Sequence, residues 1–117
     1  MTDRNEVSRM KKSLWSAQYR ARNKLSNAIV TLDNGRIYGG NAVFYFTGTY
    51  DSNQTRTSAR VIIKRYADGD SILGDIDEAV VLLSGTIGDT HIFFAGYLED
   101  QPETKFRAKM EKLADLE

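Results

Sequence analysis

Apolar and polar residues alternate along much of this chain, as expected for strands that bury one face. Between Ser13 and Ala21, the apolar residues Trp15, Ala17 and Tyr19 are separated by polar ones. The alternation returns in 28–32, 55–66 and 106–110, and short apolar runs occupy 79–86 and 91–97. Because neighbouring side chains of a strand point to opposite faces, each of these segments is predicted to be a strand.

Tight turns are predicted where glycine follows or precedes a small polar residue. Asn34-Gly35 is the strongest such signal, because a type I′ hairpin turn requires positive φ at both central residues. A second two-residue turn is predicted at Gly88-Asp89. The pair Gly39-Gly40 interrupts a strand pattern, and paired glycines there predict a bulge or a sharp bend where backbones approach closely.

The segment 42–50 is apolar on both of its faces. Phe44, Phe46 and Tyr50 share one face, and Val43 and Tyr45 share the other. One face is expected to line the core, and an apolar stripe on the other is costly to leave in water. Val43 and Tyr45 are therefore predicted to mark a homodimer face.

The fold predicted from these segments is a single all-β domain. Seven or eight short strands with closely spaced turns and no convincing amphipathic helix predict an antiparallel β-barrel, whose closure removes exposed sheet edges. The barrel is expected to span 13–113, between a polar lead at 1–12 and a tail at 114–117. Loops are predicted at 51–54 and 67–77, and Ile72-Leu73 in the second loop is expected to tuck inward as a plug.

Composition indicates the location, the available chemistry and the surface charge of the protein. The absence of cysteine excludes disulfides and thiolate chemistry, and the first twelve residues have no apolar stretch for a signal peptide or membrane span. A cytoplasmic location away from the membrane is expected. Sixteen basic and sixteen acidic residues cancel overall, yet 67–103 holds nine acids and no lysine or arginine. Such asymmetry predicts an acidic surface that favours a cationic partner.

Motifs for catalysis, metals or cofactors are incomplete. The segment 69–74 resembles a phosphate-binding loop, but Asp75 stands where lysine would meet the phosphate. A calcium loop starting at Asp68 fails because Ile72 falls on a ligand position. His91 is the single histidine and has no nucleophile at a matching spacing. The acids at 75–78 are read as a solvated loop, since a general acid needs burial. No enzyme activity, metal or cofactor is predicted.

The strand predicted at 55–66 carries residues that could form a nucleic-acid surface. Arg56, Arg60 and Lys64 share one face, and Tyr66 follows two residues later. Cations beside an aromatic residue are typical of single-strand binding platforms. The neutral overall charge argues against this interpretation, because phosphate contacts supply most of such affinity. No nucleic-acid partner is predicted from the sequence.

Six segments of the chain resemble the GrlR-like family, a bacterial group named for a negative regulator of type III secretion. They run in one order over roughly 13–113: LWS from Leu14, LDNGRIYGGNAVFYFTGTY from Leu32, ARVIIKRY from Ala59, SILGDID from Ser71, LLSGTIGDT from Leu82, and PETKFRAKMEKL from Pro102. The resemblance implies a small antiparallel β-barrel of lipocalin-like appearance that forms a dimer. The namesake represses by binding a helix-turn-helix transcriptional activator, and it carries an acidic run in the loop after the aromatic strand. Here that loop, 51–54, has one acid.

Two classes of function follow. The first is a non-enzymatic negative regulator that binds a protein partner, such as a helix-turn-helix activator, through exposed carboxylates that compete with phosphate for arginines. The candidate partner-binding residues are Asp68, Asp70, Asp75, Asp77 and Glu78. The alternative is a carrier or sensor that holds a small apolar ligand in the barrel lumen, unless large side chains fill it. The candidate lumen residues are Trp15, Tyr19, Phe44, Phe46, Ile92 and Phe94.

Overall fold

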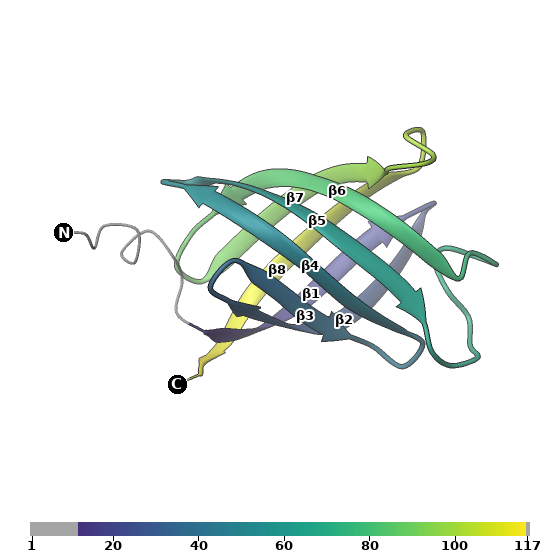
Figure 1. Ribbon diagram of the computed structural model, residues 1–117, viewed down its shortest axis with the longest axis horizontal. Helices are drawn as coiled ribbons and strands as arrows, with labels where there is room; N and C mark the ends of the chain where they lie inside the picture. Colours follow the sequence, from purple (N-terminus) through teal and green to yellow (C-terminus); the bar gives the residue numbers. More distant parts are fainter. Residues whose placement is uncertain (1–11, 117) are drawn as a thin grey trace.

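The computed structural model describes residues 12–116 as a closed antiparallel β-barrel of eight strands (Figure 1). Each strand pairs with the next in sequence, and β8 pairs with β1 to close the barrel. This confirms the predicted fold class. The strands are β1 (Ser13–Ala21), β2 (Lys24–Asp33), β3 (Arg36–Gly40), β4 (Phe44–Asn53), β5 (Arg56–Arg65), β6 (Glu78–Ile87), β7 (His91–Leu98) and β8 (Lys105–Asp115).

Alternating residues of every strand fill the barrel interior. Trp15 and Ile92 are almost wholly buried, at 0% and 1% exposure. The Trp15 indole N–H donates to Ser13 Oγ at 2.8 Å, so its one polar atom is satisfied inside the core. The alternation predicted for β5 is also correct, since Thr57, Ala59 and Ile63 are buried while their neighbours Arg56, Ser58 and Arg60 are exposed. Burial of these side chains in a continuous core is the main favourable term for the fold.

The hairpin turns agree in part with the sequence predictions. Asn34 and Gly35 have φ of 52° and 88° between the paired residues Asp33 and Arg36, as a type I′ turn requires. The turn predicted at Gly88-Asp89 is displaced by one residue. Ile87 pairs with Ile92, and Gly88 N–H donates to His91 O at 2.9 Å, which leaves Asp89 and Thr90 at the centre.

The double glycine does not form the predicted bulge. Gly39 and Gly40 keep an unbroken register with both β2 and β4. The predicted close approach is present, because a Cβ atom on Gly39 would collide with Ile29 O. The register irregularity lies instead between β1 and β8, where the pairing passes from Leu14 with Ala114 to Trp15 with Lys112.

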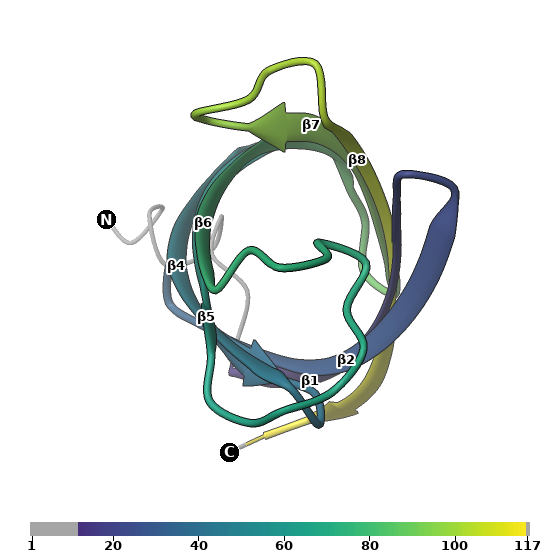
Figure 2. The ribbon, with the colours of Figure 1, turned by 90° about the vertical axis from the view of Figure 1, so that its right-hand side faces the viewer.

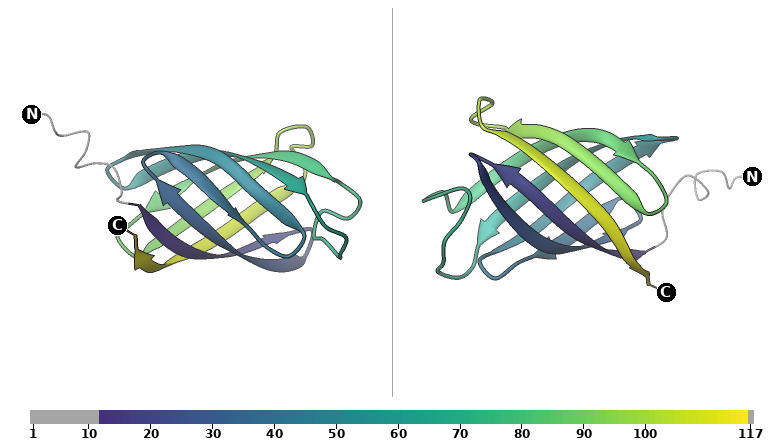
Figure 3. Two further views of the ribbon diagram at one scale, coloured as in Figure 1. Left: turned by 60° about the horizontal axis from the view of Figure 1, so that its bottom comes forward. Right: turned by 180° about the vertical axis from the view of Figure 1, so that it is seen from behind.

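Strand ends differ from the sequence prediction at three places. Residues 51–53 belong to β4 and not to a loop, β4 begins at Phe44 and not at Ala42, and β8 continues to Asp115, past the expected domain end at 113. The expected polar lead lies outside the described residues except for Lys12. Leu116 N–H donates to Lys12 O at 2.7 Å, so both ends of the described chain meet at one end of the barrel (Figure 3). Within residues 12–116, no helix has the length and apolar character to cross a membrane.

Candidate functional site

The barrel lumen is largely filled by its own side chains. A cavity of about 90 Å³ remains, lined mainly by apolar residues. Of the six candidate lumen residues, Tyr19, Phe46, Ile92 and Phe94 line this cavity. Trp15 is fully buried away from it, beneath the ammonium of Lys112. The volume of this remaining cavity is smaller than the roughly 150 Å³ of an apolar cavity that can hold benzene.

The loop between β5 and β6, residues 66–77, crosses one mouth of the barrel (Figure 2). Ile72 and Leu73 are 8% and 2% exposed and belong to the core, as the sequence predicted for an inward plug. A short turn supports them, in which Leu73 N–H donates to Ser71 Oγ at 2.8 Å. This mouth is therefore closed by the chain itself, at the end opposite the two described chain ends.

Arg65 holds the β5–β6 loop in place. Its Nε donates to Asp77 Oδ1 at 2.8 Å, and its two terminal nitrogens donate to Gly69 O and Gly74 O, each at 3.1 Å. The guanidinium also lies 5.1 Å from the centre of the Phe44 ring. Because the planar group donates to three points of the loop, a lysine at this position could not replace it.

A second, partly polar pocket lies between the loop and the barrel wall. It measures about 230 Å³ and includes Tyr19, Ser26, Asn41 and Ser71 among its lining residues. Asn41 Nδ2 donates to the Tyr19 hydroxyl at 2.7 Å, and Asn41 Oδ1 accepts the backbone N–H of Phe44 at 2.9 Å. Burial raises the pKa of the Tyr19 phenol above its ordinary 10.0, although the hydrogen bonds to Ser26 and Asn41 act in the opposite direction. The phenol stays neutral at physiological pH.

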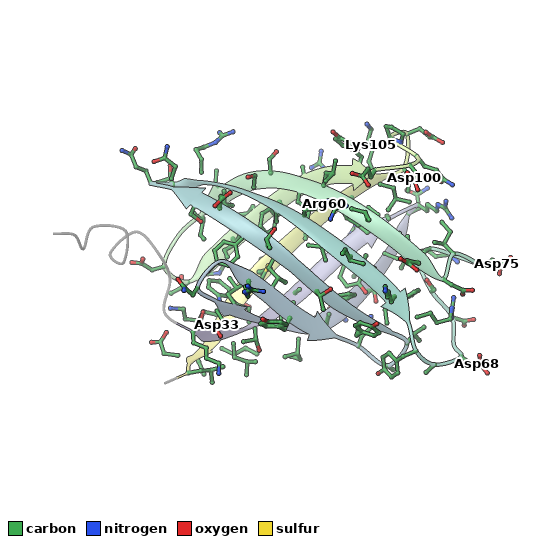
Figure 4. All side chains as sticks on the ribbon, in the orientation of Figure 1. Asp33, Arg60, Asp68, Asp75, Asp100 and Lys105 are labelled. Atoms are coloured by element: carbon green, nitrogen blue, oxygen red, sulfur yellow. The ribbon has the colours of Figure 1, made fainter. Side chains whose placement is uncertain are left out.

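The five candidate acidic residues are all exposed at the loop end of the molecule. Figure 4 shows Asp68 and Asp75 projecting from the loop away from the barrel. An open groove of about 900 Å³ is lined by Asp68, Asp70, Asp75 and Asp77, together with Lys24 and Arg65. Glu78 begins β6 and does not line this groove. Four of the five acids thus converge on one concave surface.

Asp77 differs from the other acids of the groove, because it binds Arg65 while Asp68, Asp70 and Asp75 form no ion pair within residues 12–116. Asp77 is therefore part of the loop anchor as well as of the groove. A change at Asp77 would alter the loop structure, so the role of the groove is tested more cleanly with the other three.

The two candidate dimer-face residues are separated in the structure. Val43 precedes β4, packs against the core and lies under Gly69. Tyr45 is 41% exposed on the outer wall, and its ring centre lies 6.4 Å from that of Tyr66. Ile29 and Tyr38 are also exposed on the adjacent strands β2 and β3. The outer aromatic patch therefore consists of Ile29, Tyr38, Tyr45 and Tyr66.

His91 lies on the surface beside the β6–β7 turn. Its Nδ1 is 2.9 Å from Thr90 Oγ1, and its Nε2 is 3.3 Å from Glu111 Oε2. Within residues 12–116, no group of three or more His, Asp or Glu side chains is placed to hold a metal ion. Arg56, Arg60 and Lys64 share the outer face of β5, with Arg60 3.8 Å from Glu99.

Sequence reasoning missed the residues that build the loop end. Nothing in the sequence assigned a role to Asn41 or Arg65. Arg22 also reaches the loop, donating to Leu73 O at 3.3 Å and to Gln101 Oε1 at 3.2 Å. Arg22 and Asn23 form a turn with φ of 52° and 63°. In the sequence, Asn23 after Ala21 and Arg22 is only a weak turn signal. Nothing near Arg22 or Arg65 along the chain indicates which residues these two arginines contact.

Fold and surface define an eight-stranded, closed antiparallel barrel with a plugged mouth and an acidic groove over the plug. No family model matches the chain, and no curated protein matches it.

Proposed function

We propose that this barrel is a cytoplasmic, non-enzymatic bacterial regulator that acts by binding a protein partner. The partner is a DNA-binding protein, such as a helix-turn-helix transcriptional activator, and binding represses it. The resemblance of residues 13–113 to the GrlR-like family, named for a negative regulator of type III secretion, supports repression as the outcome. Binding takes place on the outside of the barrel.

The observation that carries the proposal is the acidic groove over the plug. Three carboxylates, on Asp68, Asp70 and Asp75, are exposed there without an ion-pair partner in residues 12–116. Arginines that contact DNA phosphates also bind carboxylates in a bidentate manner. An acidic groove can therefore occupy the basic surface of an activator and keep it from DNA. Such a contact relies on exposed charges, so salt weakens it over a Debye length of about 8 Å.

The test begins with affinity capture of the partner, using the tagged full chain in its native bacterium. Association and dissociation rates are then measured with the purified partner. The triple variant Asp68→Asn, Asp70→Asn, Asp75→Asn should associate at least about tenfold more slowly at low salt, because exposed charges act mainly on the on-rate. The parent and the variant should converge as salt rises.

A matched control neutralises three acids on the other loops, Asp89→Asn, Asp100→Asn and Glu103→Gln, and should keep the parent's association rate. If the triple groove variant binds the captured partner as fast and as tightly as the parent at low salt, the groove is not the binding site. If the captured partner has no role in transcription, or if deletion of the barrel's gene changes no transcript that the partner controls, the regulatory role is wrong.

The alternative function, binding of a small apolar ligand, has the cavity of about 90 Å³ in its favour. A ligand larger than a few atoms would have to displace side chains or the plug residues Ile72 and Leu73. Its test is a thermal-shift measurement with benzene-sized apolar probes. A rise in melting temperature that Phe46→Trp removes by filling the cavity would favour the ligand-binding function over the regulatory one.

A further inference from the structure

The outer surface of β7, β8 and β1 gathers four cations beside two exposed aromatic rings. β8 presents a basic residue at every second position near its start, each facing outward. Across the β7–β8 register, the first and third of these lie opposite aromatic residues of β7, and the second lies opposite an arginine of β1. We call these six residues the β7–β8 face: Arg20, Phe93, Tyr97, Lys105, Arg107 and Lys109.

The centre of the β7–β8 face lacks acidic residues. A shallow groove of about 490 Å³ runs over it, and none of the residues that line the groove is acidic. The four cations form no ion pair within residues 12–116. Carboxylates occur at the ends of the face, where Glu111 binds His91 and where Asp100 lies at the same end of the barrel as Lys105 (Figure 4). An anionic chain can therefore approach the centre without repulsion.

The two aromatic residues of this face are placed to receive flat groups. Phe93 and Tyr97 are 49% and 38% exposed. The His91 ring stacks on Phe93 with 6.3 Å between ring centres and 10° between planes, and the Lys105 ammonium lies 5.4 Å from the Tyr97 ring centre. Four residues apart on one strand, the two rings are spaced by about 13 Å at roughly 3.3 Å per residue.

Unpaired cations next to exposed aromatic rings match the chemistry of a single-stranded nucleic acid. Such sites combine a positively charged track for the phosphates with rings on which bases stack, regardless of base identity. The wall of the barrel is convex here and no helix projects from it, so nothing is available to enter the groove of a duplex. The neutral net charge of the chain does not oppose this, because four of the acids gather in the acidic groove at the loop end, whereas the four cations of the β7–β8 face lie together on the side wall.

We propose that the β7–β8 face binds single-stranded nucleic acid, with bases stacked on Phe93 and Tyr97 and phosphates held by Arg20, Arg107 and Lys109. This binding site is separate from the acidic groove and extends the proposed function. A regulator with one surface for a basic protein and another for a single strand can bind a transcript or an opened template together with its protein partner. DNA and RNA share this chemistry, and the test separates them.

The test is fluorescence anisotropy of the full chain with labelled oligothymidylate and oligouridylate of about 12 nucleotides. Both single strands should bind, and a duplex of the same length should bind at least about tenfold more weakly. Each phosphate contact contributes about −0.7 to the slope of the logarithm of affinity against the logarithm of salt concentration. Three contacts therefore predict that affinity falls roughly fifteen- to twentyfold between about 50 and about 200 mM salt. The better of the two single strands identifies the natural class of ligand.

Two variants separate stacking from charge. Arg107→Ala with Lys109→Ala should reduce affinity and remove about 1.4 from the salt slope. Phe93→Ala with Tyr97→Ala should weaken binding at least about fivefold while the salt slope stays unchanged. The matched control is Arg36→Ala with Lys64→Ala on the opposite wall, and the triple groove variant is a second control. Both controls should bind like the parent, so this result is independent of the protein-partner test.

Three results would overturn the proposal. The first is no binding of either single strand at the lowest salt concentration. The second is equal loss of affinity in the control variants, or no loss in the aromatic variant, which would indicate non-specific charge attraction. The third is displacement of the oligonucleotide by an acidic peptide of equal length at equal or lower concentration, which would make the face a site for an acidic protein. Circular dichroism of each variant verifies that the barrel remains folded.

Discussion

At the scale of single residues, the loop end is held together by a few long polar side chains. Arg65 is the largest contributor, because it joins β5 to three points of residues 66–77 and its side chain is only 19% exposed. Hydrogen bonds from a charged group that is partly withdrawn from water contribute more than surface ion pairs do. The plug therefore depends on this arginine as well as on the burial of Ile72 and Leu73.

The first prediction concerns Arg65→Met, which keeps the aliphatic stem over Phe44 and removes the three hydrogen bonds. The free energy of unfolding should fall by about 2 kcal/mol. Hydrogen exchange in 66–77 should rise more than elsewhere, since the loop loses its anchor. Arg56→Met, an exposed change on the same strand, is the control and should alter stability by less than about 0.5 kcal/mol. Equal protection of the loop in both variants would show that Arg65 is not the anchor.

The second prediction concerns alkaline pH. The raised pKa of Tyr19 means that the folded protein keeps a proton that the unfolded chain loses above pH 10.0. The stability from the buried neutral phenol is fully present below that pH and is lost as pH rises through the folded pKa. In Tyr19→Phe, the part of the stability loss at alkaline pH that comes from Tyr19 should disappear. Stability near neutral pH should fall by about 1 kcal/mol, because the Asn41 side-chain N–H loses the Tyr19 hydroxyl as its acceptor. Denaturant unfolding from neutral to alkaline pH measures both effects. If stability falls with rising pH as steeply in Tyr19→Phe as in the parent, the contribution assigned to Tyr19 is wrong.

At the scale of strands, close packing of backbones limits which residues fit. A Cβ atom on Gly85 of β6 would collide with Phe93 O of β7, and one on Gly96 of β7 would collide with Leu82 O. Both glycines lie within the β6–β7 pairing, Gly85 beside the Thr86–Phe93 pair and Gly96 next to Tyr97 along β7. The β7–β8 face therefore depends on the absence of side chains at two positions of the inner wall.

The third prediction is that Gly85→Ala destabilises the barrel by about 1–3 kcal/mol, because the added methyl group forces β6 and β7 apart. Gly88→Ala is a matched control in the adjacent turn, where a Cβ atom would lie 3.5 Å from its nearest neighbour, His91 O. The control should change stability by less than about 0.5 kcal/mol. Thermal unfolding of the two variants is the measurement, and equal melting temperatures would contradict the packing argument.

At the scale of the whole molecule, the outer wall carries aromatic residues that the barrel does not bury. The outer aromatic patch extends over β2, β3 and β4, and Gly40 lies in register between Ile29 and Tyr45. A groove whose lining includes Ile29 and Gly40 lies beside the patch. An exposed apolar surface of this kind is typical of an interface between subunits.

The fourth prediction is that the protein forms a homodimer through this patch. Sedimentation velocity at micromolar concentration should show a dimer for the parent and a monomer for Tyr45→Arg, because a buried unpaired charge opposes association. Thr49→Arg, an exposed change on the same strand, should remain dimeric. A monomeric parent would show that the patch does not mediate self-association.

The local sequence predicted most of the strands, the Asn34-Gly35 turn and the buried plug, and the number and spacing of the strands predicted an antiparallel barrel. Alternation of side chains between two faces and the φ preferences of single residues are local properties, so a linear pattern expresses them directly. The local sequence did not determine every turn position, as the shift from Gly88-Asp89 to Asp89 and Thr90 shows. There the flanking strand register, and not the residue pair, selected the centre.

Only the tertiary structure decided which residues meet across the barrel. Arg65 with Asp77, Asn41 with Tyr19, and Arg20 with Arg107 join segments whose spacing along the chain carries no signal. Val43 likewise moved from a predicted outer stripe to a half-buried position against the core, because β4 begins only at Phe44 and the β5–β6 loop covers Val43. Strand order and register set the charge of each outer face, so a chain with no net charge has an acidic groove at one end and a basic, aromatic wall along its side. Local preferences select the elements, whereas contacts between distant segments select the surfaces.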